Sequence, residues 1–257
     1  MSWYGSMYFD KEAFVSERDK ILREGFSPDV FLGRPGLPPT CGLNVVMAWP
    51  LPEHFRLPYE ALARQLSELD PGIVVYPFDQ THITLVTVVN FRDRMNPSPE
   101  LVREIRSDAG RLTEHVRRIA GNLTPFRIDV GPPITGRQAV FLPILNPGGE
   151  VRYIRESVMT FCSRSERLAD ARVPGIIHST IARYRSAPCE PSGLLKSFET
   201  VARSTAFGCA VIDEILVTLE TRPYMNAGER AGRVQLRGAA VTSSPGTCVG
   251  SVSDVPT

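Results

Sequence analysis

The sequence predicts an α+β protein made of two related lobes, and two observations support this prediction. Residues 81–89 carry His82 and Thr84 in an apolar stretch, and a near-copy of its first half returns far downstream in residues 178–184. In both places a strand and a helix precede the stretch in the same order. Because a repeated order of elements indicates internal duplication, we expect one bilobal body.

Short runs rich in β-branched residues, ended by Pro or Gly, predict the strands, and apolar residues at 3.6-residue spacing predict the helices. The first lobe is expected to contain a strand, a helix, a short strand, the motif strand and a long helix, over residues 43–49, 59–69, 73–76, 81–89 and 101–121. The second lobe is expected to contain two strands, a helix, the second motif strand, a helix, one long strand and a closing strand, over residues 126–130, 139–145, 149–168, 178–184, 193–201, 211–219 and 233–237.

The two ends of the chain fall outside this duplicated body, which we place at residues 42–241. Residues 1–41 form an N-terminal appendage that holds a helix capped by Asp10. The appendage continues into a Pro-rich connection, residues 27–40, which either packs against the body or covers a cleft. Residues 242–257 are small and polar, and we expect this tail to be disordered.

Charge and composition limit the classes of partner. The chain of 257 residues is 42% hydrophobic, enough for a sizeable core. Its 29 basic side chains against 28 acidic ones give a formal charge of only +1, so no broad electrostatic footprint for duplex DNA is expected. A small nucleotide or an RNA end is a better-matched partner.

The five cysteines are scattered and contain no Cys-x-x-Cys pair, which favours a reducing compartment over a disulfide framework or a zinc site. No basic region followed by an apolar run opens the chain, and no stretch is long and apolar enough to span a bilayer. These features predict an intracellular protein, cytoplasmic or nuclear, without a membrane partner. We expect a monomer.

The two motif stretches carry the residues suited to chemistry. Side chains on a strand alternate between faces, so His82 lies beside Thr84 and His178 beside Thr180. An imidazole can give or take a proton near neutral pH, and a threonine hydroxyl can donate a hydrogen bond to a phosphate oxygen. Two such pairs facing across a cleft would supply a general acid, a general base and two phosphate contacts.

These residues resemble the signature motifs of a known family. His-x-Thr-Leu at 82–85 and His-x-Thr-Ile-Ala-Arg at 178–183 are similar to the two motifs of the 2H phosphoesterase superfamily. That family includes RNA 2′,5′-ligase-like proteins, cyclic nucleotide phosphodiesterases of tRNA splicing, and enzymes that trim RNA ends. The second motif is the closer match, because in the first Val86 and Thr87 stand where the family has a small residue and an arginine.

The resemblance implies two antiparallel sheets that flank a central groove, with the helices on the outside. It also implies a hydrolase that acts without metal or other cofactor: a phosphodiesterase that cleaves a 2′,3′-cyclic or 2′,5′-linked phosphodiester in a nucleotide or RNA end. His82 and His178 would be the catalytic acid and base, in an order that the sequence leaves open, and Thr84 and Thr180 would bind the substrate phosphate.

A nucleobase could stack on an aromatic side chain near the motifs. By alternation, Tyr184 shares a face with His178 and Thr180, so it is the candidate for base stacking. Arg183 should then project from the opposite face, away from the phosphate, unless the strand twists or ends there.

Rival chemistries lack their motifs. Neither His-x-Thr stretch has a second His or a carboxylate two positions on to complete a zinc site, and the chain has neither a Gly-x-Ser-x-Gly elbow nor a Gly-x-x-x-x-Gly-Lys phosphate loop. Two alternatives to the phosphodiesterase stay open: an enzyme that trims or ligates RNA ends, and a module that binds nucleotides or RNA ends without turnover.

Overall fold

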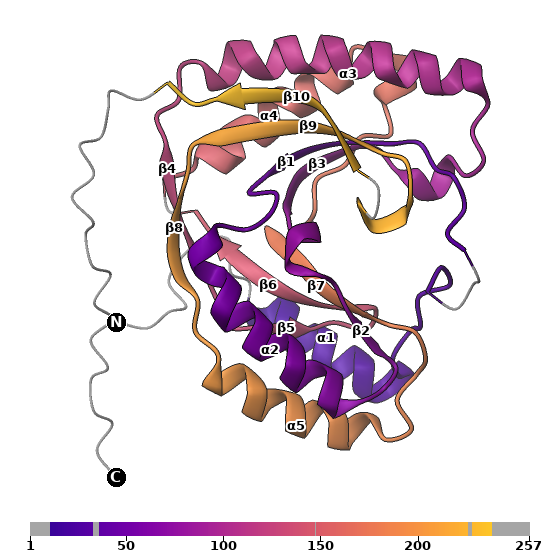
Figure 1. The fold of residues 1–257 in the computed structure, drawn as a ribbon, viewed down its shortest axis with the longest axis vertical. Helices are drawn as coiled ribbons and strands as arrows, with labels where there is room; N and C mark the ends of the chain where they lie inside the picture. Colours follow the sequence, from indigo (N-terminus) through magenta and orange to yellow (C-terminus); the bar gives the residue numbers. More distant parts are fainter. Residues whose placement is uncertain (1–10, 33–35, 147, 226–227, 238–257) are drawn as a thin grey trace.

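The computed structural model describes residues 11–32, 36–146, 148–225 and 228–237. It has an α+β fold with two antiparallel sheets and helices on their outer sides (Figure 1), which confirms the predicted fold class. The predicted tail, residues 242–257, lies outside the described residues. The division of the chain near residues 41 and 241 stays a prediction.

The first sheet has the strand order β10-β9-β1-β3, and each pairing is antiparallel. Its strands are β1 (Gly42–Met47), β3 (Ile83–Val89), β9 (Glu214–Glu220) and β10 (Gly228–Gln235). Every residue of β1 is buried, which fits a central strand covered on both faces.

The second sheet has the order β2-β7-β6-β4-β8. Its strands are β2 (Ile73–Val75), β4 (Phe126–Val130), β6 (Ala139–Leu145), β7 (His178–Tyr184) and β8 (Gly208–Ile212), and the short β5 (Ile134–Thr135) pairs with β6. The two motif strands therefore lie in different sheets. β3 and β7 nevertheless approach each other, so the two motifs are brought together between the sheets.

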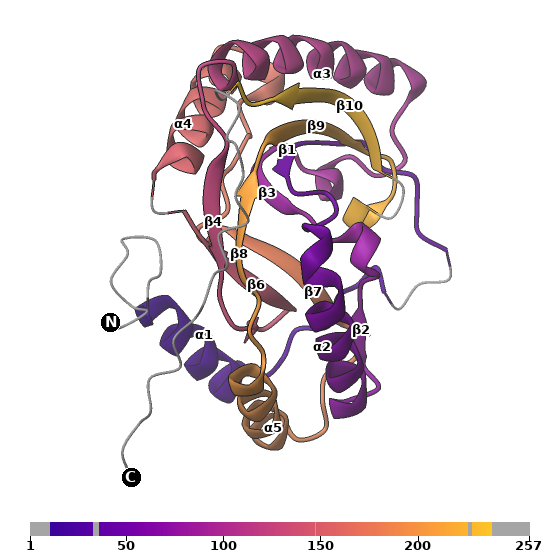
Figure 2. The ribbon, with the colours of Figure 1, turned by 60° about the vertical axis from the view of Figure 1, so that its left-hand side comes forward.

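Helices cover the two sheets from opposite sides. Helices α3 (Pro99–Ala120) and α4 (Glu150–Cys162) lie over the first sheet, whereas α1 (Lys11–Glu24), α2 (Arg56–Leu69) and α5 (Pro191–Ser204) lie along the second (Figures 1 and 2). The long helix α3 begins at an N-cap, where the Ser98 hydroxyl accepts a hydrogen bond from the Leu101 amide at 3.2 Å and Pro99 occupies the first turn.

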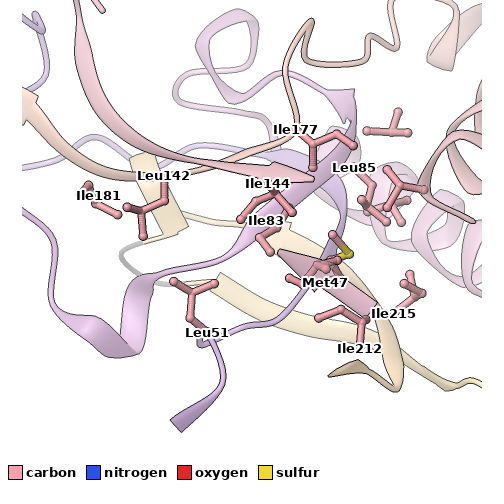
Figure 3. Close-up of a cluster of buried hydrophobic side chains, with 14 of the residues drawn as sticks. Met47, Leu51, Ile83, Leu85, Leu142, Ile144, Ile177, Ile181, Ile212 and Ile215 are labelled. Atoms are coloured by element: carbon pink, nitrogen blue, oxygen red, sulfur yellow. The ribbon is translucent and has the colours of Figure 1, made fainter. Parts of the chain in front are cut away.

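Two helices pack on a sheet other than the one whose strand they follow in the chain. Helix α2 follows β1 of the first sheet but packs on β2 in the second, and α4 follows β6 of the second sheet but packs on β3 in the first. As a result the lobes share one hydrophobic core, in which Ile83, Leu142 and Ile215 from both sheets belong to the same cluster (Figure 3). The region between the two sheets is therefore supported by one continuous hydrophobic core.

Several elements differ from the sequence prediction, and β9 and β10, which were predicted in the second lobe, lie in the first sheet. The short strand β2 pairs with β7 of the second lobe and so joins the second sheet. The predicted strand 211–219 is two strands, because the chain leaves the second sheet after Ile212 and enters the first at Glu214. The predicted helix 149–168 ends at Cys162, and a separate 3-10 turn, Glu166–Leu168, follows.

Candidate functional site

The two motif histidines are anchored in the same way. The Nδ1–H of His82 donates to the carbonyl oxygen of Gln80 at 2.9 Å, and the Nδ1–H of His178 donates to that of Ile176 at 2.8 Å. A carbonyl oxygen can only accept, so in each neutral ring the proton sits on Nδ1 and Nε2 carries the lone pair. Nε2 is therefore the atom of each ring that can exchange a proton with a ligand.

A single pocket brings the two His-x-Thr pairs together. His82, Thr84, His178 and Thr180 all line a pocket of about 220 Å³ between the sheets. A second hollow of about 500 Å³ shares His178, Thr180 and Arg183 with it and extends toward Lys20 and Arg137. We call these two hollows, which share lining residues, the groove. All four predicted catalytic and phosphate-binding residues thus line one groove.

A β-bulge in β7 decides which side chains after Thr180 reach the groove. Thr180 pairs with Phe141 and Ala182 pairs with the preceding residue, Val140, so Ile181 is the extra residue of the bulge. A bulge shifts the alternation of side chains by one position. Arg183 consequently lines the groove beside Thr180, contrary to the expectation from strict alternation.

The same bulge removes Tyr184 from the groove. Its side chain is 1% exposed, it packs against Phe26 with ring centroids 4.6 Å apart, and its hydroxyl bonds to that of Thr135. The prediction that Tyr184 shares a face with His178 is therefore wrong, and no face of its ring is open to a base. Phe141, whose ring lies 5.2 Å from that of His178, is the aromatic residue that lines the groove there.

The first motif strand contains matching bulges. Thr84 pairs with Val46 and Val86 with Val45, which leaves Leu85 as the extra residue. Thr87 then lines the groove at the same offset from His82 that Arg183 has from His178. The two motif strands therefore present equivalent positions, and the first has a hydroxyl where the second has a guanidinium.

A buried carboxylate that the sequence did not reveal organises one wall of the groove. The Asp29 side chain is 1% exposed, and its Oδ2 accepts from Arg92 at 3.1 Å and from Arg183 at 3.4 Å. It also accepts from the hydroxyl of Tyr224, and Arg183 donates through Nε to the hydroxyl of Tyr76 at 2.9 Å. We call these five residues the Asp29 cluster.

No local pattern marks the Asp29 cluster in the sequence. Asp29 lies in the Pro-rich connection, Arg92 follows the first motif strand and Tyr224 lies in a 3-10 turn after β9. Only tertiary packing brings these segments together. Among the members of the cluster that line the groove, Arg183 alone belongs to a motif.

A second buried carboxylate, Glu220, lies at the groove. Its oxygens accept from the Met225 amide at 2.9 Å and from the Asn44 side chain at 3.3 Å, and both Glu220 and Asn44 line the pocket. Burial raises the pKa of Glu220 to about 7, although these hydrogen bonds and Arg183 oppose the shift.

Both catalytic candidates have a lowered pKa. Burial lowers the pKa of His82 below 6.5, its bond to Gln80 opposes this, and the nearby His178 lowers the pKa further. Burial also lowers the pKa of His178, with Arg183 adding to the effect. Both rings are therefore neutral at pH 7. A bound phosphate anion would favour the protonated form of one of them.

The other two histidines lie elsewhere. His115 on α3 stacks on Phe161 with ring centroids 4.8 Å apart, and the exposed His54 bonds to the carbonyl oxygen of Cys209 at 3.0 Å. Across the described ranges, His, Cys, Asp and Glu side chains form no group of three or more that could hold a metal ion. None of the helices in the described part of the chain combines the length and apolar character needed to cross a bilayer.

The structure is an α+β protein with two anchored histidines between two sheets, and its fold occurs in solved structures. TT0787 of Thermus thermophilus is similar with a TM-score of 0.50 and 21% identity, over 77% of this chain and 98% of that chain. LigT of E. coli complexed with 3′-AMP is similar with a TM-score of 0.50 and 15% identity, over 78% of this chain and 99% of that chain.

Comparisons of sequence give no match: no family model matches the chain, and neither does any curated protein. The likeness to TT0787 and to LigT is therefore one of fold. The two antiparallel sheets and outer helices of the present structure agree with the fold that the His-x-Thr motifs implied.

Proposed function

We propose that the chain is a phosphodiesterase of the 2H type that opens a 2′,3′-cyclic or cleaves a 2′,5′-linked phosphodiester in a nucleotide or RNA end. One observation carries the proposal: two imidazoles with identical Nδ1 anchors line one pocket, each with a threonine from its own strand. That pair can transfer the protons of an in-line displacement by itself, so the proposed reaction requires no metal.

In the proposed reaction Nε2 of one histidine takes a proton from the attacking water as its oxygen bonds to phosphorus. Nε2 of the other, protonated, gives a proton to the ribose oxygen as its bond to phosphorus breaks. Thr84, Thr180 and Arg183 donate hydrogen bonds to the non-bridging oxygens, where charge increases in the transition state. The two histidines have equivalent Nδ1 anchors, so either histidine can take either part, depending on how the substrate enters.

The name of one structural neighbour is consistent with this substrate class. LigT was solved in complex with 3′-AMP, a nucleotide that carries its phosphate on the ribose 3′ oxygen. Opening of a 2′,3′-cyclic phosphate gives a product of the same kind, a 2′- or 3′-monophosphate. We propose that the groove of the present chain binds such a nucleotide with its phosphate at His82 and His178.

The proposal is tested with nucleoside 2′,3′-cyclic phosphates, 2′,5′-linked dinucleotides and short RNAs, incubated with chelator and analysed by mass. His82→Ala and His178→Ala should each lower kcat by about 100-fold or more on the substrate found, because each removes a proton-transfer group. His54→Ala is the matched control, since His54 lies outside the groove, and it should retain wild-type kcat.

Unchanged turnover in both histidine variants would end the proposal. Tight nucleotide binding without any product would instead indicate a binding module. Shortened or joined RNAs among the products would point to end trimming or ligation, the remaining alternative within the enzyme class.

A further inference from the structure

The groove has more cationic side chains than the reacting phosphate uses. Arg183 belongs to the second motif strand and stands beside His178 and Thr180. Arg92 and Arg172 line the same pocket but belong to neither motif. A single phosphodiester carries one negative charge, and Arg183 with the two threonines can satisfy its two non-bridging oxygens. Arg92 and Arg172 therefore call for a separate explanation.

Arg92 is held in place from several sides. Its Nη2 donates to Asp29 at 3.1 Å and to the Tyr224 hydroxyl at 3.0 Å. Its guanidinium carbon lies 5.1 Å from the ring centroid of Phe31 and 5.6 Å from that of Phe91. A free arginine side chain loses rotamer entropy when a ligand orders it. Because folding already orders the Arg92 side chain, ligand binding there should cost little further entropy. Such pre-organisation is typical of a ligand site.

Arg172 is fixed through its backbone. Its N–H donates to the Thr87 carbonyl and its carbonyl accepts from the Thr87 amide, each at 2.9 Å. Thr87 is the residue that occupies, on the first motif strand, the position of Arg183 on the second. The first strand thus brings no guanidinium of its own, and the segment paired with Thr87 brings one to that side of the groove.

Resting on the proposed function, we propose that Arg92 and Arg172 form a subsite for a second phosphate of the substrate, separate from the one that reacts at His82 and His178. The substrate class is then a nucleotide or oligonucleotide that carries an additional phosphate, either a terminal monoester or the next internucleotide diester.

The carboxylate that also faces this pocket is already engaged. Glu220 accepts from the Met225 amide and from Asn44, and burial favours its neutral form. Asp29 is buried beneath Arg92 and Arg183 and is shared by both, so it fixes the two guanidinium groups relative to each other. The second phosphate would therefore meet cationic groups at the pocket wall.

The test uses binding, which requires no turnover. Calorimetric titration compares a nucleoside 3′-monophosphate with the corresponding 3′,5′-bisphosphate and with a dinucleotide ending in a 3′-phosphate. The full chain should bind at least one of the two larger ligands about tenfold more tightly than the monophosphate, as charge-assisted contacts of this kind allow. Arg92→Ala and Arg172→Ala should each reduce that gain to below about threefold.

Arg118→Ala, an exposed arginine on α3, is the matched control and should keep the full gain. Arg172 is exposed, so its variant tests the subsite even if loss of Arg92 disturbs folding. Tighter binding of the bisphosphate alone would show that the subsite takes a terminal phosphate. Tighter binding of the dinucleotide alone would show that it takes an internucleotide phosphate.

The subsite is refuted if wild type shows no gain with either ligand, or if both arginine variants keep it. A full gain in a protein that cleaves no phosphodiester would refute the proposed function and leave the subsite standing.

Discussion

The tautomer of each motif histidine is set by one hydrogen bond to its own chain. His82 and His178 both donate Nδ1–H to the carbonyl oxygen two residues earlier. This hydrogen bond holds the ring against rotation and leaves Nε2 as the basic atom. Nε2 is then free to exchange a proton with the substrate, as general acid–base catalysis requires. Because the two rings are equivalent in this respect, the substrate decides which of them is the acid.

The lowered pKa values of the two histidines predict the pH dependence of the reaction. One ring must be neutral and the other protonated, so the bell-shaped profile of kcat/KM, which reports the free enzyme, should have its maximum below pH 6.5, the ordinary pKa of both. A bound phosphate anion favours protonation, so the maximum of kcat should lie at higher pH.

Initial rates measured across pH 4.5–9 on the identified substrate check this prediction. The prediction would fail if kcat/KM kept rising above pH 7, or if the profiles of kcat and kcat/KM coincided.

The buried Glu220 predicts that the free energy of unfolding falls as pH rises. Its pKa rises from 4.5 to about 7 on folding, so the folded state holds the proton more tightly. Its contribution to stability is fully present below pH 4.5 and is lost as pH rises through 7. Relative to wild type, Glu220→Gln should therefore gain about 2–3 kcal/mol in free energy of unfolding between pH 5 and pH 8.

Urea denaturation of both proteins at the two pH values measures this difference. The two histidines act in the other direction, because a lowered pKa costs stability as pH falls below 6.5. They are present in both proteins and cancel in the comparison. Glu68 is an exposed glutamate on α2, so the free energy of unfolding of Glu68→Gln should change with pH as that of wild type does. The prediction would be contradicted if Glu220→Gln also changed with pH as wild type does.

At the scale of the element, the β-bulges explain what the sequence could and could not reveal. The existence of both motif strands, and the pairing of each histidine with its threonine, followed from composition and alternation over three residues. The bulge at Ile181 depends on how β7 pairs with Val140 and Phe141 of β6, which no local pattern states. Alternation therefore predicted the wrong faces for Arg183 and Tyr184, the two residues just beyond the bulge.

The same limit applies to the strand boundaries. Residues 211–219 were predicted as one strand although Asp213 and Glu214 interrupt their apolar pattern, and the chain changes sheets at Asp213. That change is set by where the two sheets separate, a property of the assembled fold. The sequence predicted the kinds and order of most elements because each depends on local periodicity, whereas sheet membership depends on partners far away in the chain.

At the scale of the whole molecule, the groove depends on residues 27–29, which precede the body predicted at residues 42–241. The amide of Asp29 donates to the carbonyl of Tyr184 at 2.7 Å, at the end of β7, and Ser27 donates to the carbonyl of Arg137 at 2.9 Å. Through its side chain Asp29 also joins Arg92, after β3, and Tyr224, after β9. Segments from both sheets and from the N-terminal part of the chain thus converge on one carboxylate.

This convergence predicts a large stability cost for a small change. In Asp29→Asn the shape is kept but the charge that faces Arg92 and Arg183 is lost. Breaking a buried ion pair leaves its partners uncompensated, so the free energy of unfolding should fall by about 2–4 kcal/mol in urea denaturation of the full chain. Tyr224→Phe, which removes one hydroxyl that bonds to Asp29 and Arg92, should cost about 1–2 kcal/mol.

Asp19→Asn is the control, because Asp19 is an exposed aspartate on α1, and it should change stability by less than about 0.5 kcal/mol. The expected order of cost is Asp29→Asn, then Tyr224→Phe, then Asp19→Asn. If Asp29→Asn lowered the free energy of unfolding no more than Asp19→Asn, the N-terminal segment would contribute little to stability. The fixed spacing of Arg92 and Arg183 would then need another cause. If the order holds, the N-terminal segment that carries Asp29 is part of the structural basis of the groove.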